Sequence, residues 1–310
     1  MSTQHDPAGH ITQETLANGL ETNRVFDAVS GFLASIQTGT TGNPTLRQNV
    51  SYLWDKVGGL TQRQDNAQGL TESFYYDDLH RLDDSTLKVG AGAPTTNLDL
   101  AYNAMGNITS KSDVGSYTYH ATRKHAVITA GSYTFSYDNN GNMTAGRGAT
   151  IARTSYNLPS AITNGSISTQ SFYAPDRSYW KQIAAYTGGT ETTLYLGGTL
   201  EKVTRANGTT DWRHRITTPG AGSILYIRQS GGTNLTYSIA GDHLGSTSVV
   251  TDSAQALVVS QSFGAYGARR GSNWQGTPSS GDLTQIEATT RRGFTEITGS
   301  IRDFVCEACH

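Results

Sequence analysis

The stretch Phe135-Ser136-Tyr137-Asp138-Asn139-Asn140-Gly141-Asn142-Met143 decides the fold of this chain, because it places a turn signal between two strand-like segments. Phe135 and Tyr137 are two residues apart and therefore share one face of a strand. Asp138 opens a turn by accepting hydrogen bonds from the backbone that follows it, and Gly141 supplies the positive φ that closes the turn. The pattern predicts a β-hairpin with an aromatic face.

The same unit recurs along the first half of the chain, with the order apolar, any, aromatic, Asp or Asn, any, any, Gly, any, apolar. Its aromatic, turn-opening and turn-closing positions are Trp54, Asp55 and Gly58; Tyr76, Asp77 and His80; Tyr102, Asn103 and Gly106; and Tyr137, Asp138 and Gly141. One hairpin cannot bury its aromatic face alone, so we expect the copies to stack and to form a core between them.

Composition agrees with a strand-rich chain. Of 310 residues, 35 are Gly and 16 are Tyr, while charged residues make up 15%, against about 25% in a typical soluble domain. No long stripe of apolar residues has helical spacing, so we predict an all-β fold with only minor helices. The net charge of −2 gives no broad positive potential that would attract nucleic acid, and no apolar run is long enough for a membrane helix.

No linker divides the sequence. We predict a single, incomplete shell segment over residues 1–295 and a divergent tail over 296–310. The first ten residues lack the features of a signal peptide, so the localisation of the chain itself stays unknown. Both cysteines lie in the tail, so no disulfide can hold the body of the protein together.

Several motifs, taken in order, resemble the Rhs or YD-repeat family, which forms hollow β-shells in bacterial polymorphic toxins and insecticidal toxin complexes and is related to the shell of animal teneurins. Besides the repeats, the matching stretches are 125–127, 137–143, 156–159, 195–198, the loop with Asp242, His243 and Gly245, and 263–267. The resemblance implies a spiral of hairpins wrapped around a cargo, usually a C-terminal toxin. It also implies secreted or cell-surface delivery in bacterial competition.

The chain departs from that family in two ways. Family shells usually have many more repeats, so the sequence is similar to the C-terminal part of a shell. The family's Asp-Pro cleavage motif is missing at the corresponding end, because the only Asp-Pro dipeptide is Asp6-Pro7. No cleavage residues are therefore assigned.

Three other groups could carry chemistry. Asp242 and His243 form the most enzyme-like pair, since a His beside a carboxylate can act as a general base; we expect them instead to order a turn.

The tail motif of Cys306, Cys309 and His310 fits haem attachment or half of a zinc site, but it lacks partner ligands. Arg205, Arg213, His214 and Arg215 surround Trp212; we expect Trp212 and Ile216 to face the core and the arginines to face solvent.

These observations predict a non-catalytic fragment of an Rhs-type β-shell that encapsulates and presents a toxin domain absent from this chain. Its partners would be the toxin cargo and the rest of the shell, with self-association through open strand edges, and we expect no cofactor. The alternative is a surface adhesin or carbohydrate-binding repeat module with exposed rows of Tyr, and an enzyme centred on Asp242 and His243 comes third. The burial of the Tyr side chains would separate the first two hypotheses.

Overall fold

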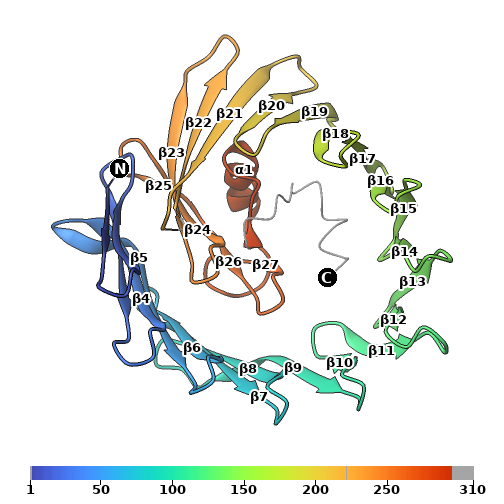
Figure 1. Ribbon diagram of the computed structural model, residues 1–310, viewed down its shortest axis with the longest axis horizontal. Coiled ribbons are helices and arrows are strands. Elements are labelled where there is room, and N and C mark those ends of the chain that lie inside the picture. Colours follow the sequence, from blue (N-terminus) through green and yellow to red (C-terminus); the bar gives the residue numbers. More distant parts are fainter. Residues whose placement is uncertain (1, 221, 295–310) are drawn as a thin grey trace. The chain divides into compact units, whose positions relative to one another are not determined.

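The computed structural model describes residues 2–220 and 222–294 of the chain, and these are almost entirely β-structure. Strands β1 to β27 occur with one helix, α1 (Ser280–Ala288), near the end of the described part (Figure 1). Nearly every strand pairs with its neighbour along the chain in antiparallel fashion. The structure confirms the predicted all-β class and its stacked hairpins.

The first half of the chain contains β1 (Thr3–His5), β2 (Ile11–Thr15), β3 (Glu21–Phe26), β4 (Leu33–Thr40), β5 (Asn43–Trp54), β6 (Leu60–Asp65), β7 (Leu70–Tyr76), β8 (Leu82–Val89), β9 (Thr95–Tyr102), β10 (Ile108–Lys111), β11 (Gly115–Tyr119), β12 (Val127–Ala130), β13 (Tyr133–Tyr137), β14 (Met143–Gly146) and β15 (Ala149–Arg153). The second half contains β16 (Pro159–Asn164), β17 (Ile167–Tyr173), β18 (Tyr179–Tyr186), β19 (Gly189–Leu196), β20 (Leu200–Thr204), β21 (Thr210–Thr217), β22 (Ser223–Gln229), β23 (Leu235–Gly241), β24 (Thr247–Asp252), β25 (Leu257–Ser260), β26 (Ser262–Phe263) and β27 (Arg269–Arg270).

The described residues form two compact units. Unit 1 comprises 2–98, 215–226 without 221, and 235–294; unit 2 comprises 99–214 and 227–234. In unit 1, strands β1 to β8 pair consecutively, and so do β23, β24 and β25. In unit 2, the strands from β10 to β21 form most of the structure.

The core of unit 1 lies between its N-terminal strands and the C-terminal segment 235–294. Leu70 of β7, Leu87 of β8 and Trp274 pack together as one buried cluster. Polar contacts join the same two parts: Arg47 donates from Nε to the carbonyl of Gln255 at 2.8 Å, and Asn18 donates from Nδ2 to the carbonyl of Asp252 at 2.8 Å. The C-terminal segment is therefore fixed to the first repeats.

Helix α1 belongs to this segment and is short because its sequence gives it little apolar surface. Ser279 caps the start of the helix, where its hydroxyl accepts a hydrogen bond from the Asp282 amide, and the Asp282 carboxylate suits the positive end of the helix. Only Ile286 of the helix is buried. Ile286 is thus the main apolar anchor of the helix, and Leu283 is half-buried.

A common turn follows the strands that end in the repeat motif. In the copy at Asp138, the Asp138 amide donates to the Asn142 carbonyl, the Gly141 amide donates to the Asp138 carbonyl, and the Asp138 carboxylate accepts from the amides of Asn140 and Asn142. Asp55, Asp77, Asn103 and Asp242 accept in the same way from the amides two and four residues later. The side chain thus supplies the hydrogen bonds that the turning backbone needs.

The turn requires positive φ at its fourth residue. Gly58, Gly106 and Gly141 have φ of 89°, 85° and 87°, and His80 takes the same position with φ of 58°. His is one of the few side chains that are enriched in this region, which explains why it can replace Gly in one copy.

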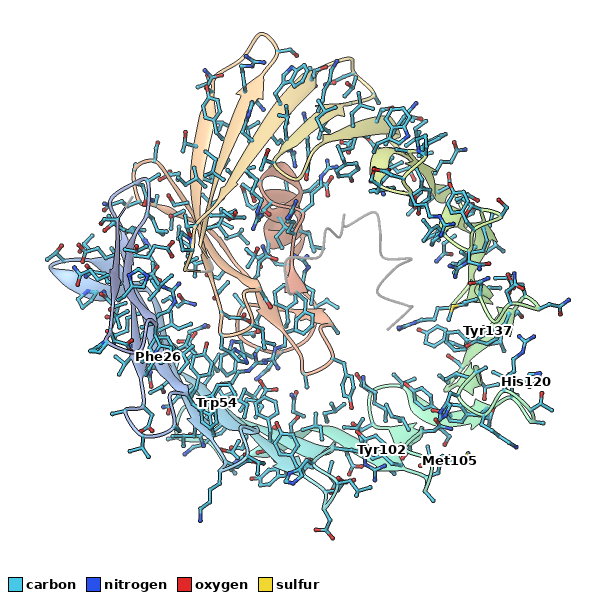
Figure 2. All side chains as sticks on the ribbon, viewed as in Figure 1. Phe26, Trp54, Tyr102, Met105, His120 and Tyr137 are labelled. Atoms are coloured by element: carbon cyan, nitrogen blue, oxygen red, sulfur yellow. The ribbon has the colours of Figure 1, made fainter. Side chains whose placement is uncertain are left out.

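At five of the strand ends, the aromatic residue before the turn donates its polar hydrogen to the first residue of the preceding strand. Tyr76, the last residue of β7, donates its hydroxyl to the carbonyl of Leu60, the first residue of β6, at 2.9 Å. We call a hydrogen bond from the last residue of one strand to the first residue of the preceding strand a last-to-first bond. Such bonds also join Trp54 to Leu33, Tyr119 to Ile108, Tyr137 to Val127 and Tyr173 to Pro159 at 2.7–2.9 Å. Figure 2 shows Trp54 and Tyr137 at the ends of their strands.

These last-to-first bonds lie where the strand ladder is irregular. The pairing register shifts at each of these aromatic residues, for example between Tyr75 and Tyr76 and between Ser136 and Tyr137. A bulge disrupts the ladder locally, and the hydroxyl or indole hydrogen supplies a donor at that point. Arg153, the last residue of β15, occupies the position that is aromatic at the other strand ends. Its guanidinium supplies the donor instead and binds the carbonyl of Met143, the first residue of β14.

We predict that Tyr137→Phe lowers the free energy of unfolding by about 1 kcal/mol, because it removes one hydrogen bond and leaves the ring in place. Tyr133→Phe on the same strand is the matched control, since Tyr133 is 38% exposed and its hydroxyl has no partner among the described residues. Urea unfolding measures both variants. Equal loss in the two variants would contradict a role for the last-to-first bond.

Candidate functional site

A buried carboxylate joins the first repeats to the C-terminal segment of unit 1. Glu72 of β7 is fully buried and accepts from both guanidinium nitrogens Nη1 and Nη2 of Arg270, at 3.0 and 2.7 Å. Arg63 of β6 donates from Nε to the same carboxylate at 2.7 Å, and Asn97 donates from Nδ2 at 2.8 Å. We call Glu72, Arg63, Arg270 and Asn97 the carboxylate clasp.

The ring of Trp274 covers this clasp, with the guanidinium carbons of Arg63 and Arg270 at 5.0 and 5.3 Å from its centroid. Burial raises the pKa of Glu72, but the charges and hydrogen bonds of the two arginines outweigh that effect and hold the pKa below its ordinary value. Glu72 is therefore ionised at neutral pH inside the core.

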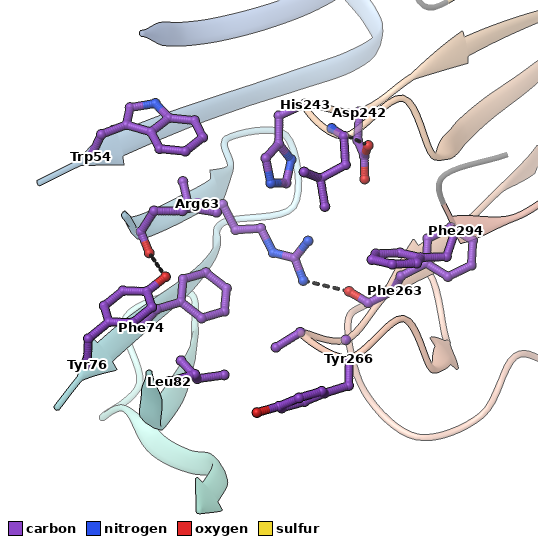
Figure 3. A pocket seen from close by; sticks show the side chains of 14 residues that line it. Trp54, Arg63, Phe74, Tyr76, Leu82, Asp242, His243, Phe263, Tyr266 and Phe294 are labelled. Carbon is purple, nitrogen blue, oxygen red and sulfur yellow. Dashed lines mark hydrogen bonds between the residues drawn. The ribbon is translucent and has the colours of Figure 1, made fainter. Parts of the chain in front are cut away.

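Beside the clasp lies a cavity of about 340 Å³ in unit 1 (Figure 3). Its walls are mainly aromatic and come from the first repeats and from the C-terminal segment. The principal lining residues are Trp54, Arg63, Phe74, Tyr76, Asp242, His243, Phe263, Tyr266 and Phe294. The repeat residues Trp54 and Tyr76 are thus brought together with the two later motif stretches around 242–246 and 263–267.

Arg63 links the clasp to the cavity. Besides binding Glu72, it donates from Nη2 to the carbonyl of Phe263 at 2.6 Å, a bond drawn in Figure 3. Leu244 and Tyr266, which also line the cavity, are 52% and 43% exposed. The cavity is therefore reached from the surface beside these two residues.

His243 projects into the cavity next to aromatic rings. Its ring centroid lies 4.7 Å from that of Tyr52 and 6.1 Å from that of Trp54, and its Nδ1 is buried without a hydrogen-bond partner among the described residues. Burial lowers the pKa of His243 to about 4; the charge of Asp242 opposes this shift and that of Arg63 adds to it. The imidazole is neutral at pH 7.

Asp242 does not orient His243 for catalysis. One oxygen of its carboxylate accepts from the amides of Leu244 and Ser246, at 2.9 and 2.8 Å, and Gly245 closes this turn with φ of 77°. The lining residues of the cavity include no Ser, Thr, Cys or Lys that His243 could activate as a nucleophile. The Asp242 carboxylate thus orders its own turn.

The prediction that Trp212 and Ile216 face the core while the neighbouring arginines face solvent was wrong. Arg213 and Arg215 are 3% and 6% exposed, whereas Ile216 is 51% exposed and Trp212 is half-buried. The physical reason is an ion pair on the buried face of the strand. Oδ2 of Asp211, a residue that is 2% exposed, lies 3.7 Å from Nη2 of Arg213. The charges on this strand are therefore buried together.

The remaining predicted site residues are placed as follows. The repeat residues all lie in the common turn described above or directly before it: Trp54, Asp55, Gly58, Tyr76, Asp77, Tyr102, Asn103, Gly106, Tyr137, Asp138 and Gly141. Cys306, Cys309 and His310 lie outside the described residues. Within the described ranges, no group of three or more His, Cys, Asp or Glu could hold a metal ion, and no helix is long and apolar enough to cross a membrane.

Arg63, Glu72 and Arg270 were not predicted from the sequence. A signal for Glu72 exists in the sequence, because Leu70, Glu72 and Phe74 alternate on one strand face and two of them are apolar. A carboxylate at such a position requires a buried cation. Nothing local identifies that cation, since Arg270 is 198 residues away.

We predict that Glu72→Gln lowers the free energy of unfolding by about 3–5 kcal/mol, because two buried arginines lose their shared counter-charge. Asp78→Asn, at an exposed position two residues beyond β7, is the control and should change stability little. Urea unfolding of both variants tests this. A Glu72→Gln protein as stable as the wild type would contradict the importance of the carboxylate clasp.

His243 predicts a pH dependence of stability. The unfolded chain takes up a proton near pH 6.5, whereas folded His243 does so only near pH 4, so stability falls as the pH drops between these values, by up to about 3 kcal/mol. His243→Phe should keep the ring contacts and remove this part of the dependence. Unfolding series at pH 7, 6, 5 and 4.5 measure it, and identical pH profiles for both proteins would refute the assignment.

The fold is similar to that of part of two solved structures. "Crystal Structure of TcdB2-TccC3-TEV" matches with a TM-score of 0.70 at 15% sequence identity over 87% of this chain, and "Crystal Structure of TcdB2-TccC3 without hypervariable C-terminal region" matches with a TM-score of 0.65 at 14% identity over 90%. The chain spans 16% of each of those chains. No protein-family model matches the sequence, and no curated protein is similar to it. At this level of identity the likeness shows a shared fold: the chain has the fold of a segment of these TcdB2-TccC3 structures.

Proposed function

We propose that this chain is a non-catalytic segment of an Rhs-type β-shell, which encloses a toxin cargo together with other shell parts. The observation that carries the proposal is the last-to-first bonding of the repeats. Six strand ends are bound by a side-chain donor to the first residue of the preceding strand, as Tyr76 is to Leu60. A chain built in this way extends by adding hairpins and makes a continuous wall.

The structural likeness to the TcdB2-TccC3 complexes supports a shell-like role in a toxin complex. Because this chain spans 16% of those chains, the shell proposal requires further shell segments, on the same or another polypeptide, and a cargo. The same likeness supports delivery outside the producing cell as part of the proposal.

The arrangement of the aromatic residues favours a wall over a sugar-binding surface. Tyr76 and Tyr137 use their hydroxyls on backbone carbonyls, and the neighbouring rings of Tyr173, Tyr179 and Tyr195 lie against one another with centroids 4.9–5.6 Å apart. Rings that contact each other offer few free faces to a sugar. The adhesin hypothesis therefore has less support than the shell hypothesis.

Co-expression of the chain with the polypeptides encoded beside it tests the proposal. We expect one of them to co-purify and to resist a protease concentration that digests it when it is free. Glu72→Gln should reduce this protection, because it opens the carboxylate clasp, and Asp78→Asn should preserve it. Neighbouring polypeptides that neither co-purify nor gain protection would refute encapsulation, and binding to a glycan array instead would favour the adhesin.

A further inference from the structure

One face of the sheet in unit 2 carries a row of alternating apolar and cationic side chains. Directly opposed residues of neighbouring strands share a face. The register pairs Phe172 with Lys181, Lys181 with Leu194, Leu194 with Lys202, and Lys202 with Trp212. The guanidinium of Arg228 on β22 continues this order, 5.7 Å from the Trp212 ring centroid. We call Phe172, Lys181, Leu194, Lys202, Trp212 and Arg228 the cation–apolar row.

The row faces outward. Residues one position away along β19, β20 and β21, namely Thr193, Val203 and Asp211, are at most 3% exposed and lie on the opposite face. The row residues are half-buried, and Arg228 is exposed. The charged groups at the ends of the Lys and Arg side chains are therefore available at the surface.

The positive charge of the row is uncompensated. Lys181, Lys202 and Arg228 form no ion pair with any described residue. The next row on the same face contains only uncharged residues, Gln170, Ile183, Thr192, Thr204 and Thr210. The acidic residues of these strands, Glu191, Glu201 and Asp211, alternate onto the other face. Three cations thus act together on one line.

The aromatic rings of the row are covered by its own cations. The Lys181 Nζ lies 4.9 Å from the Phe172 centroid, and the Lys202 Nζ lies 5.0 Å from the Trp212 centroid, with Arg228 on the neighbouring strand. Stacking of a nucleobase or a sugar needs a free ring face. A partner would therefore contact the cations of the row and the apolar side chains between them, and would not stack on a free ring.

The spacing of the cations indicates the shape of the partner. They occur on every second strand, which places them about 9–10 Å apart along the row. An extended polyproline II segment presents every third residue on one side, at intervals of about 9.3 Å. We propose that the cation–apolar row binds an extended acidic polypeptide with Asp or Glu at every third position.

This site does not depend on the shell function. The probe is a fluorescein-labelled peptide with the sequence Glu-Pro-Ala repeated four times, and binding is measured by fluorescence anisotropy at low salt. We expect saturable binding that weakens as salt increases. Neutralising one cation, as in Lys202→Gln, should weaken binding about two- to fivefold. The triple variant Lys181→Gln, Lys202→Gln, Arg228→Gln should weaken it about ten- to a hundredfold.

A matched triple variant, Lys56→Gln, Lys88→Gln, Lys124→Gln, removes the same charge elsewhere and should leave binding unchanged; thermal melts verify that both triple variants are folded. A peptide of the same composition with its glutamates in one block should bind more weakly. Equal binding by both triple variants would overturn the proposal, as would no binding at low salt. Binding to phosphatidylserine vesicles without binding to the peptide would also overturn it and would assign the row to a membrane surface.

Discussion

The carboxylate of Glu72 is the constraint on which unit 1 depends. Two guanidinium groups, one from the neighbouring strand and one from the C-terminal segment, share this single buried charge. A buried ion is tolerated only when its partners are complete, so the C-terminal segment must dock in one register before the core can close. The clasp therefore contributes to the specificity of the fold as well as to its stability.

The cavity beside the clasp is a consequence of the same docking. Arg63 is held by Glu72 on one side and by the Phe263 carbonyl on the other, so its guanidinium cannot fill the space in front of His243. The aromatic walls then remain apart around a neutral imidazole. A cation held at both ends thus helps to keep a mostly apolar space open in unit 1.

The hairpins could be predicted from the sequence because their signals are local. Asp138 and Gly141 are three residues apart, and the hydrogen bonds of the turn join residues at most four positions apart. The role of the Tyr137 hydroxyl could not be predicted, because it depends on a bulge and on the start of another strand. Arg270 could not be paired with Glu72 across 198 residues. The faces of β21 were misassigned because its charged residues Asp211, Arg213 and Arg215 are the buried ones, whereas charged side chains ordinarily face solvent.

Among the described residues, the last-to-first bonds occur at one end of the hairpins, beside the common turn. At the other end, tight connections such as those between β12 and β13, and between β16 and β17, are free of these bonds. Extra residues can enter such a connection without disturbing the donor that holds the next repeat. The two ends of the hairpins thus differ in their tolerance of change: the end with the last-to-first bonds is constrained by them, while we expect the other end to accept insertions such as epitope tags.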